Sequence, residues 1–175
     1  MSPRIPYAAP EPGSKTEAML QRLPLNVLRM LAHHPEGLRG FQTLGEAILN
    51  RSALDPALRE LAILRVGWLV GAAYETAHHE RIGRAVGMSE AQIAAARSGD
   101  RAGLSEDDAL VLDVAEEIEA GGLSEATFAR AAQRFSHREL VELALACGYY
   151  GMVSRFLKSF AIPLEDDAIS PPARG

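Results

Sequence analysis

The sequence predicts an all-α fold, a compact domain of several helices. Three observations favour this class: helix start signals recur along the chain, apolar residues are spaced at three- and four-residue steps, and strand-like alternation is not sustained. Val111, Val114, Ala115 and Ile118 illustrate the spacing, because they share one face of a helix. The chain has 175 residues, 47% of them hydrophobic, which is enough for one well-formed core.

Each expected helix is justified by a start signal or by its apolar spacing. The start signals, which resemble N-caps or capping boxes, are Asp55 with Pro56, Ser89 with Gln92, Ser105 with Asp108, Ser124 with Glu125, and Ser136 with Glu139. We expect helices at 16–33 (bent near Pro24), 36–49, 55–70, 73–86, 89–97, 105–120, 124–134 and 136–160. Glycines mark the turns at Gly87, Gly99 to Gly103, and Gly121 with Gly122.

Proline and glycine concentrate at both ends of the chain, where regular structure is not expected. The sequence therefore predicts an N-terminal arm at 1–15, one helical domain at 16–165 and a C-terminal tail at 166–175.

The net charge and the cysteine content limit the classes of partner and the compartment that the sequence allows. The net charge of -5 and the pI near 5.6 argue against nucleic acid and anionic lipid as partners. The apolar runs, such as VGWLVGAAY, are shorter than the roughly 20 residues of a membrane span. Cys147 stands alone, so an intrachain disulfide is impossible and a reducing compartment is expected. We predict a cytoplasmic protein that binds neither membrane nor nucleic acid.

Glu60 is the first candidate for chemistry. Its neighbours three and four residues on are Ile63 and Leu64, so a helix would carry this carboxylate on an apolar face. A buried carboxylate without a partner has a raised pKa, which suits acid-base chemistry near neutrality. The alternative is an exposed glutamate that pairs with Arg59 or Arg65.

Glu75 and His79 are the second candidate. They are four residues apart, so on a helix the carboxylate can orient the imidazole, which could then act as a general acid or base. A surface pair without function would look the same in sequence. His78 points about 100° away around the helix and is expected in solvent or at an interface.

Other residues near this motif have two interpretations each. Tyr74 could offer a hydroxyl donor to a substrate, or pack as an amphipathic residue. Arg65 could neutralise a substrate carboxylate, or form an ion pair. Cys147 is expected to pack as a small hydrophobe in an apolar helix, and Tyr149 and Tyr150 to line the same pocket as the motif or an interface.

A metal site built from Glu60, Glu75 and His79 would suit a divalent cation, but the sequence has no HExxH motif and no EF-hand loop. We therefore expect no metal. The acid-base chemistry considered above also requires no organic cofactor.

The run RELAILRVGWLVGAAYETAHHERIGRAVGMSEAQI resembles the carboxymuconolactone decarboxylase-like family of the alkylhydroperoxidase D-like superfamily. The resemblance extends over about residues 4 to 165, through NVLRMLAHHPEGL, LSEDDALVLDVAEE and RELVELALACGYYGMVSRFL. It implies an all-helical domain that acts on a small molecule and assembles as a homo-oligomer, in trimers or multiples of them, with the site near a subunit interface.

The resemblance also implies roles for individual positions. Peroxidase-type members use a glutamate, a Cys-x-x-Cys pair and a histidine four residues after the second cysteine. Glu60 and His79 match the glutamate and the histidine, whereas the cysteine positions fall on Ala72 and Glu75. Decarboxylase-type members likewise lack the cysteines and keep the histidine. We therefore expect His79 as general acid or base, Glu75 as its orienter, and Glu60 as a second proton carrier or a buried hydrogen-bond acceptor.

The function expected from these residues is cofactor-free acid-base chemistry, a decarboxylation or related lyase reaction on a small carboxylated, lactone-like molecule. One alternative is an alkylhydroperoxidase or peroxiredoxin-type antioxidant, which would have to use Cys147. The other is a non-catalytic oligomer that binds a small molecule through the same residues.

Overall fold

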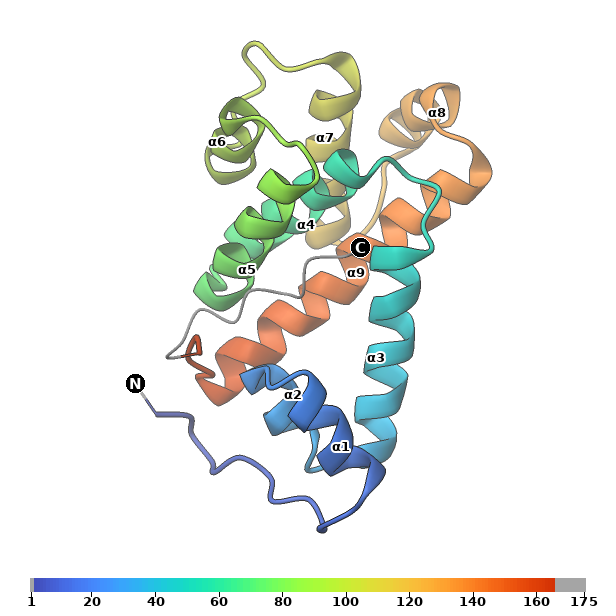
Figure 1. The fold of residues 1–175 in the computed structure, drawn as a ribbon. Helices are drawn as coiled ribbons and strands as arrows, with labels where there is room; N and C mark the ends of the chain where they lie inside the picture. The colour runs from blue at the N-terminus through green and yellow to red at the C-terminus, as the bar shows by residue number, and fades with distance from the viewer. Residues whose placement is uncertain (1, 166–175) are drawn as a thin grey trace. The chain divides into compact units, whose positions relative to one another are not determined.

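The computed structural model describes residues 2–165, and within that range the regular elements are all α-helices (Figure 1). The predicted all-α class is confirmed for these residues. The helices are α1 Lys15–Arg22, α2 Asn26–Leu31, α3 Pro35–Asn50, α4 Pro56–Val70, α5 Ala73–Ala85, α6 Glu90–Ser98, α7 Glu106–Ala120, α8 Glu125–Arg134 and α9 His137–Phe160. The C-terminal tail predicted at 166–175 lies outside the described residues.

The start signals act as the sequence predicts. Asp55 accepts hydrogen bonds from the backbone of Ala57 and Leu58, with Pro56 in the first turn of α4. Ser89 and Ser105 each form a reciprocated capping box, at the starts of α6 and α7. Because these caps satisfy amide groups that a helix leaves unpaired, most helix starts fall within one or two residues of the prediction.

The predicted helix at 16–33 is wrong as a single bent element. The helix ends at Arg22, Leu23 takes a non-helical conformation (φ -137, ψ 81), and α2 starts after Leu25. Pro24 explains the break, because proline has no amide hydrogen and disfavours helical geometry in the residue before it.

The chain forms two compact units, which are described separately. The first, here called the central unit, comprises Gly45–Phe156. Within it α4 packs against α5, α6 and α7, and α7 packs against α8; Figure 1 shows α4 between α5 and α7. Helix α4 is apolar on nearly every face, so most of it is buried. A charged residue on a helix that is buried on nearly every face is therefore buried as well.

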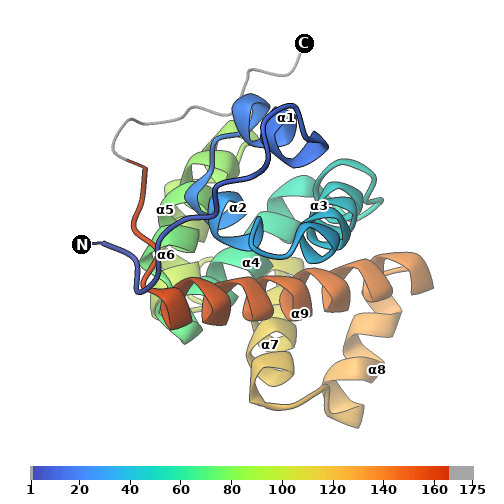
Figure 2. The ribbon, with the colours of Figure 1, turned by 90° about the horizontal axis from the view of Figure 1, so that it is seen from below.

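Among the described residues, the second unit combines residues 2–44 with residues 157–165. Figure 2 shows its N-terminal arm passing α2 toward the end of α9. The arm has no helix before Lys15, but the amide of Ala8 donates to Arg29 O (3.3 Å) and His33 contacts Pro6 O (2.9 Å). The guanidinium group of Arg29 also lies 4.2 Å from the centre of the Tyr7 ring. These contacts hold the arm against α2.

Helix α9 has the length and apolar composition of a membrane span, and half of its most apolar window is buried inside the structure. Core helices of soluble proteins pass the same test, so this is weak evidence for a membrane.

Candidate active site

The connection between α4 and α5 places the predicted site residues opposite one another. Gly71 ends α4 in the left-handed conformation (φ 71, ψ 43), and the amide of Ala72 donates back to Gly67 O (2.9 Å). A Cβ atom on Gly67 would lie only 3.0 Å from a methyl group of Thr76, so glycine permits close approach of the two helices. The inner face of α4 therefore meets the first two turns of α5.

At this meeting point the structure brings together Glu60, Glu75 and His79. The Nδ1 atom of His79 lies 2.6 Å from Glu60 Oε2, and its Nε2 atom lies 3.1 Å from Glu75 Oε1. All three residues are buried, with exposed fractions of 0% for Glu60, 5% for Glu75 and 4% for His79. Glu60 is therefore not an exposed glutamate, and Glu75 and His79 are not a surface pair.

Arg59 joins this cluster, although the sequence singled it out only as a possible surface partner of Glu60. Its Nε and Nη2 atoms both lie 3.3 Å from Glu60 Oε1, and the residue is buried. The sequence feature that could have indicated this role is its position next to Glu60, at the start of an otherwise apolar helix. The cluster of Arg59, Glu60, Glu75 and His79 holds two positive and two negative groups when all are ionised, which offsets much of the cost of burying charge.

The two carboxylates determine the protonation state of His79. An imidazole can donate from both nitrogens only when it is a cation. Burial alone would lower the pKa of His79, but the charge and hydrogen bond of Glu60, together with those of Glu75, outweigh it and raise the pKa from 6.5 to about 10. At neutral pH His79 is therefore an imidazolium with each N–H directed at a carboxylate.

Two tyrosines from α9 complete the surroundings of His79. The Tyr150 ring lies edge-to-face with the imidazole, with ring centres 4.6 Å apart, and the Tyr149 ring lies edge-to-face with Tyr150 at 5.1 Å. Burial, reinforced by the nearby charge of Glu75, raises the pKa of both phenols. Their hydroxyl groups stay protonated at neutral pH.

Tyr74 and His78 lie beside this cluster on α5. The Tyr74 ring is buried and packs against His78, with ring centres 4.6 Å apart. His78 is half-buried. The packing interpretation of Tyr74 describes these contacts, and a substrate-binding role for its hydroxyl stays a prediction.

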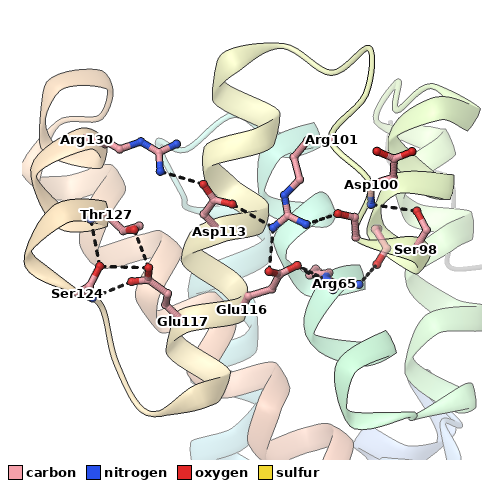
Figure 3. Close-up of polar contacts among 12 residues, drawn as sticks. Arg65, Ser98, Asp100, Arg101, Asp113, Glu116, Glu117, Ser124, Thr127 and Arg130 are labelled. Carbon is pink, nitrogen blue, oxygen red and sulfur yellow. Dashed lines mark hydrogen bonds and ion pairs between the residues drawn. The ribbon is translucent and has the colours of Figure 1, made fainter.

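The structure does not bring Arg65 to the cluster, because its guanidinium is engaged elsewhere. Its Nε atom donates to Glu116 Oε1 (2.8 Å), and Nη1 donates to the carbonyls of Ala96 and Arg97 at the end of α6 (3.2 and 3.3 Å). Figure 3 shows Glu116 also meeting Arg101 in a network that continues along α7 to α8. The ion-pair interpretation of Arg65 therefore describes its contacts, which tie α4 to α6 and α7.

Comparison with known proteins relates one segment of the chain to a family. Residues 35–117 match the model of the carboxymuconolactone decarboxylase family. A crystal structure of a peroxidase-related protein from Silicibacter sp. TM1040 superposes with a TM-score of 0.78 at 19% identity, covering 95% of each chain. The segment from α3 to α7 is therefore similar to the carboxymuconolactone decarboxylase family.

Other solved structures share the fold of this chain. The alkylhydroperoxidase AhpD core protein from Ralstonia eutropha JMP134 has a TM-score of 0.73 at 18% identity, covering 91% of this chain and 95% of its own. The debrominase Bmp8 has a TM-score of 0.71 at 18% identity, covering 91% of both chains. No curated protein matches in sequence. At these identities the comparisons establish the fold, and they leave the reaction open.

The single cysteine of this protein is sequestered from solvent. Cys147 is fully buried on α9, as the small-hydrophobe interpretation predicts. Burial, with a further contribution from the charge of Glu119, raises the pKa of its thiol to about 12. The nucleophilic form of cysteine is the thiolate, so this thiol is unreactive at neutral pH.

The geometry of the cluster does not form a metal-binding set. Among residues 2–165, no group of three or more histidine, cysteine, aspartate or glutamate side chains is arranged to hold a metal ion. The two nitrogens of His79 are each directed at a different carboxylate, so the three predicted side chains do not converge on one point.

Proposed function

We propose that this protein catalyses a cofactor-free proton transfer, in a decarboxylation or related lyase reaction on a small carboxylated, lactone-like molecule. The observation that supports it is the buried His79 imidazolium held between Glu60 and Glu75. Strongly perturbed ionisable groups in a buried cluster are typical of acid-base sites. The match of residues 35–117 to a family named for a decarboxylase supports the same reaction class.

The charge balance of the cluster suits an anionic substrate. Arg59, Glu60, His79 and Glu75 sum to zero when ionised, so a bound carboxylate adds an uncompensated negative charge. In a site with little water such a charge favours uptake of a proton by the cluster. Substrate binding would thereby load the proton that the reaction consumes.

We assign that proton to Glu75. The Nδ1 side of His79 is engaged by Glu60 at 2.6 Å and Glu60 is also contacted by Arg59, so this side of the cluster serves as a support. Glu75 lies on the opposite side of the imidazole, in the first turn of α5. Its position also corresponds to the second cysteine of the peroxidase-type members that the sequence resembles. His79 then restores the proton of Glu75 from Nε2, rather than acting on the substrate directly.

The proposed reaction balances as follows. The bond between the substrate and its carboxylate breaks, carbon dioxide leaves, and the electron pair moves into the conjugated lactone. A carbon of the conjugated system takes the proton from Glu75, which becomes a carboxylate again. One proton is taken up from water for each carbon dioxide released.

Deuterium incorporation tests this assignment. With carboxymuconolactone or a related unsaturated lactone acid in D₂O, the wild-type protein should release carbon dioxide and give a product with one deuterium per turnover. Glu75→Gln should lower kcat by about 10²–10⁴-fold, because an amide cannot donate the proton. Cys147→Ser should turn over like the wild type, since Cys147 is buried on another helix. Mass spectrometry of the product provides the readout.

Two other outcomes would replace the proposal. Consumption of a hydroperoxide that is lost in Cys147→Ser would indicate the thiol peroxidase. Ligand binding altered by Glu60→Gln and His79→Ala, without turnover of any compound in a broad set of lactone acids, would indicate the non-catalytic binding protein.

We also propose that the protein is a cytoplasmic homo-oligomer, in trimers or multiples of them. Three large apolar side chains on α9 support self-association: Val141, Leu145 and Met152 have exposed fractions of 59%, 45% and 50%. Their steps of four and seven residues place them on one face of the helix. Leu145→Glu should lower the mass measured by light scattering to that of one chain, whereas Ala126→Glu, on α8, should leave it unchanged. An unchanged mass in Leu145→Glu would place the interface elsewhere.

A further inference from the structure

A line of aromatic contacts connects α3 to the His79 side chain within the central unit. A Cβ atom on Gly45 of α3 would lie 2.8 Å from the Tyr149 hydroxyl oxygen and 3.4 Å from the adjoining ring carbon. The hydroxyl of Tyr149 therefore rests against the helix backbone in the space that any other residue would fill. Tyr149 then packs on Tyr150, and Tyr150 on His79.

These rings restrict one another. The planes of Tyr149 and Tyr150 meet at 80°, and those of Tyr150 and His79 at 76°. All three residues are buried, so a ring that rotates must displace the next one. Edge-to-face contacts of this kind stabilise the arrangement beyond what the burial of area contributes.

The imidazole needs such a restraint because its outer torsion is intrinsically broad. Glu60, itself contacted by Arg59, faces His79 from α4, and Glu75 faces it from its own helix. Tyr150, which packs on Tyr149, faces it from α9. Only one ring orientation allows Nδ1 to meet Glu60 while Nε2 meets Glu75. The charged groups attract the nitrogens, whereas the aromatic contacts limit the tilt of the ring.

We propose that Tyr149 and Tyr150, seated by Gly45, are positioning residues that hold the His79 imidazole where both of its nitrogens meet a carboxylate. The effect of this positioning on catalysis rests on the proposed function. The protonation state of the His79 imidazole, however, can be measured without any substrate.

Gly45→Ala is the most direct test, with Gly40→Ala as its matched control. Both glycines lie in α3, and alanine favours a helix over glycine to a similar extent at either position. A Cβ atom on Gly40 meets no described atom within 4 Å, whereas the one on Gly45 collides with Tyr149. A difference between the two variants therefore reports on the displacement of Tyr149.

The measurement is nitrogen NMR of the protein labelled in its histidines, as a function of pH. The wild type and Gly40→Ala should show both His79 nitrogens protonated at pH 8. Gly45→Ala should lower the midpoint of the His79 titration by at least one pH unit, a tenfold loss of proton affinity, because the tilted ring loses one carboxylate. Tyr150→Leu should do the same, and Tyr150→Phe, which keeps the ring, should behave as the wild type.

Unchanged His79 titrations in both Gly45→Ala and Tyr150→Leu would overturn the proposal. If Gly45→Ala does not fold, the comparison of Tyr150→Leu with Tyr150→Phe carries the same test. Where the proposed reaction is also observed, Gly45→Ala should reduce kcat about tenfold with little change in KM, because a misplaced group slows the chemical step without removing binding. Shifted titrations in a protein without turnover would support the positioning role and reject the proposed function.

Discussion

His79→Leu is expected to destabilise the folded protein by about 3–5 kcal/mol and to remove turnover, because it leaves a buried carboxylate without its partner. Leucine fills much of the volume of the imidazole, so the loss reports on charge rather than on a cavity. In the wild type Glu60 and Glu75 share the single imidazolium, and only Glu60 is also contacted by Arg59. Urea unfolding and a turnover assay measure the two effects.

A double variant separates charge from packing. His79→Leu with Glu75→Leu removes one positive and one negative group, which leaves the pair of Arg59 and Glu60 balanced. It should recover at least half of the stability lost in the single variant, without recovering activity. His78→Ala, at the neighbouring half-buried position, should cost less than about 1 kcal/mol. A double variant no more stable than His79→Leu would show that the buried charges do not account for the loss.

The helix starts could be predicted because they depend on local chemistry. Ser89 and Ser105 cap their helices through contacts within three residues, and such contacts are visible in sequence spacing. The break at Pro24 was predicted only as a bend. Proline disfavours the helix, but whether the chain bends or leaves the helix depends on its packing.

The candidate site could be predicted only where its contacts are local. Glu75 and His79 are one helical turn apart, so their contact follows from spacing. Glu60 is 19 residues from His79 along the chain, and their contact requires the turn at Gly71. From sequence alone, Glu60 was grouped with His79 only in the metal-site hypothesis and through the family resemblance.

Arginine partners were the least predictable part. Arg59 and Arg65 flank the same apolar stretch of α4, and either could have paired with Glu60. Arg65 instead pairs with Glu116, 51 residues away in the chain. Which arginine faces which helix is decided by how α4 packs against α5 and α7, and spacing along a single helix does not contain that information.

The stability of the fold should fall as the pH rises from about 6.5 to about 10. The pKa of His79 is raised to about 10 in the folded state, against 6.5 in an unfolded chain, so between these values the folded protein holds a proton that the unfolded chain has released. The stabilisation is complete below pH 6.5 and is lost by about pH 10. Over this pH range the free energy of unfolding should fall by at most about 5 kcal/mol.

A different residue, Glu142, determines how stability changes at acidic pH. Despite partial desolvation, hydrogen bonds from Arg138, Ser52 and the backbone of Ala53 and Leu54 lower the pKa of Glu142 from 4.5 to about 2. This contribution is present above pH 4.5 and is lost as the pH falls toward 2. These two groups place the greatest stability between about pH 4.5 and 6.5.

The double variant His79→Leu with Glu75→Leu isolates the alkaline effect. Groups that titrate alike in both proteins cancel when the two unfolding profiles are subtracted. Burial raises the pKa values of Tyr149 and Tyr150, the tyrosines beside His79, above this pH range. Fluorescence of Trp68, the single tryptophan, can follow urea unfolding from pH 5 to 10. The wild type should lose stability across that range and the double variant should stay nearly flat. Parallel profiles would mean that His79 is not held as an imidazolium, and the charge-balanced cluster on which the proposed reaction depends would not exist.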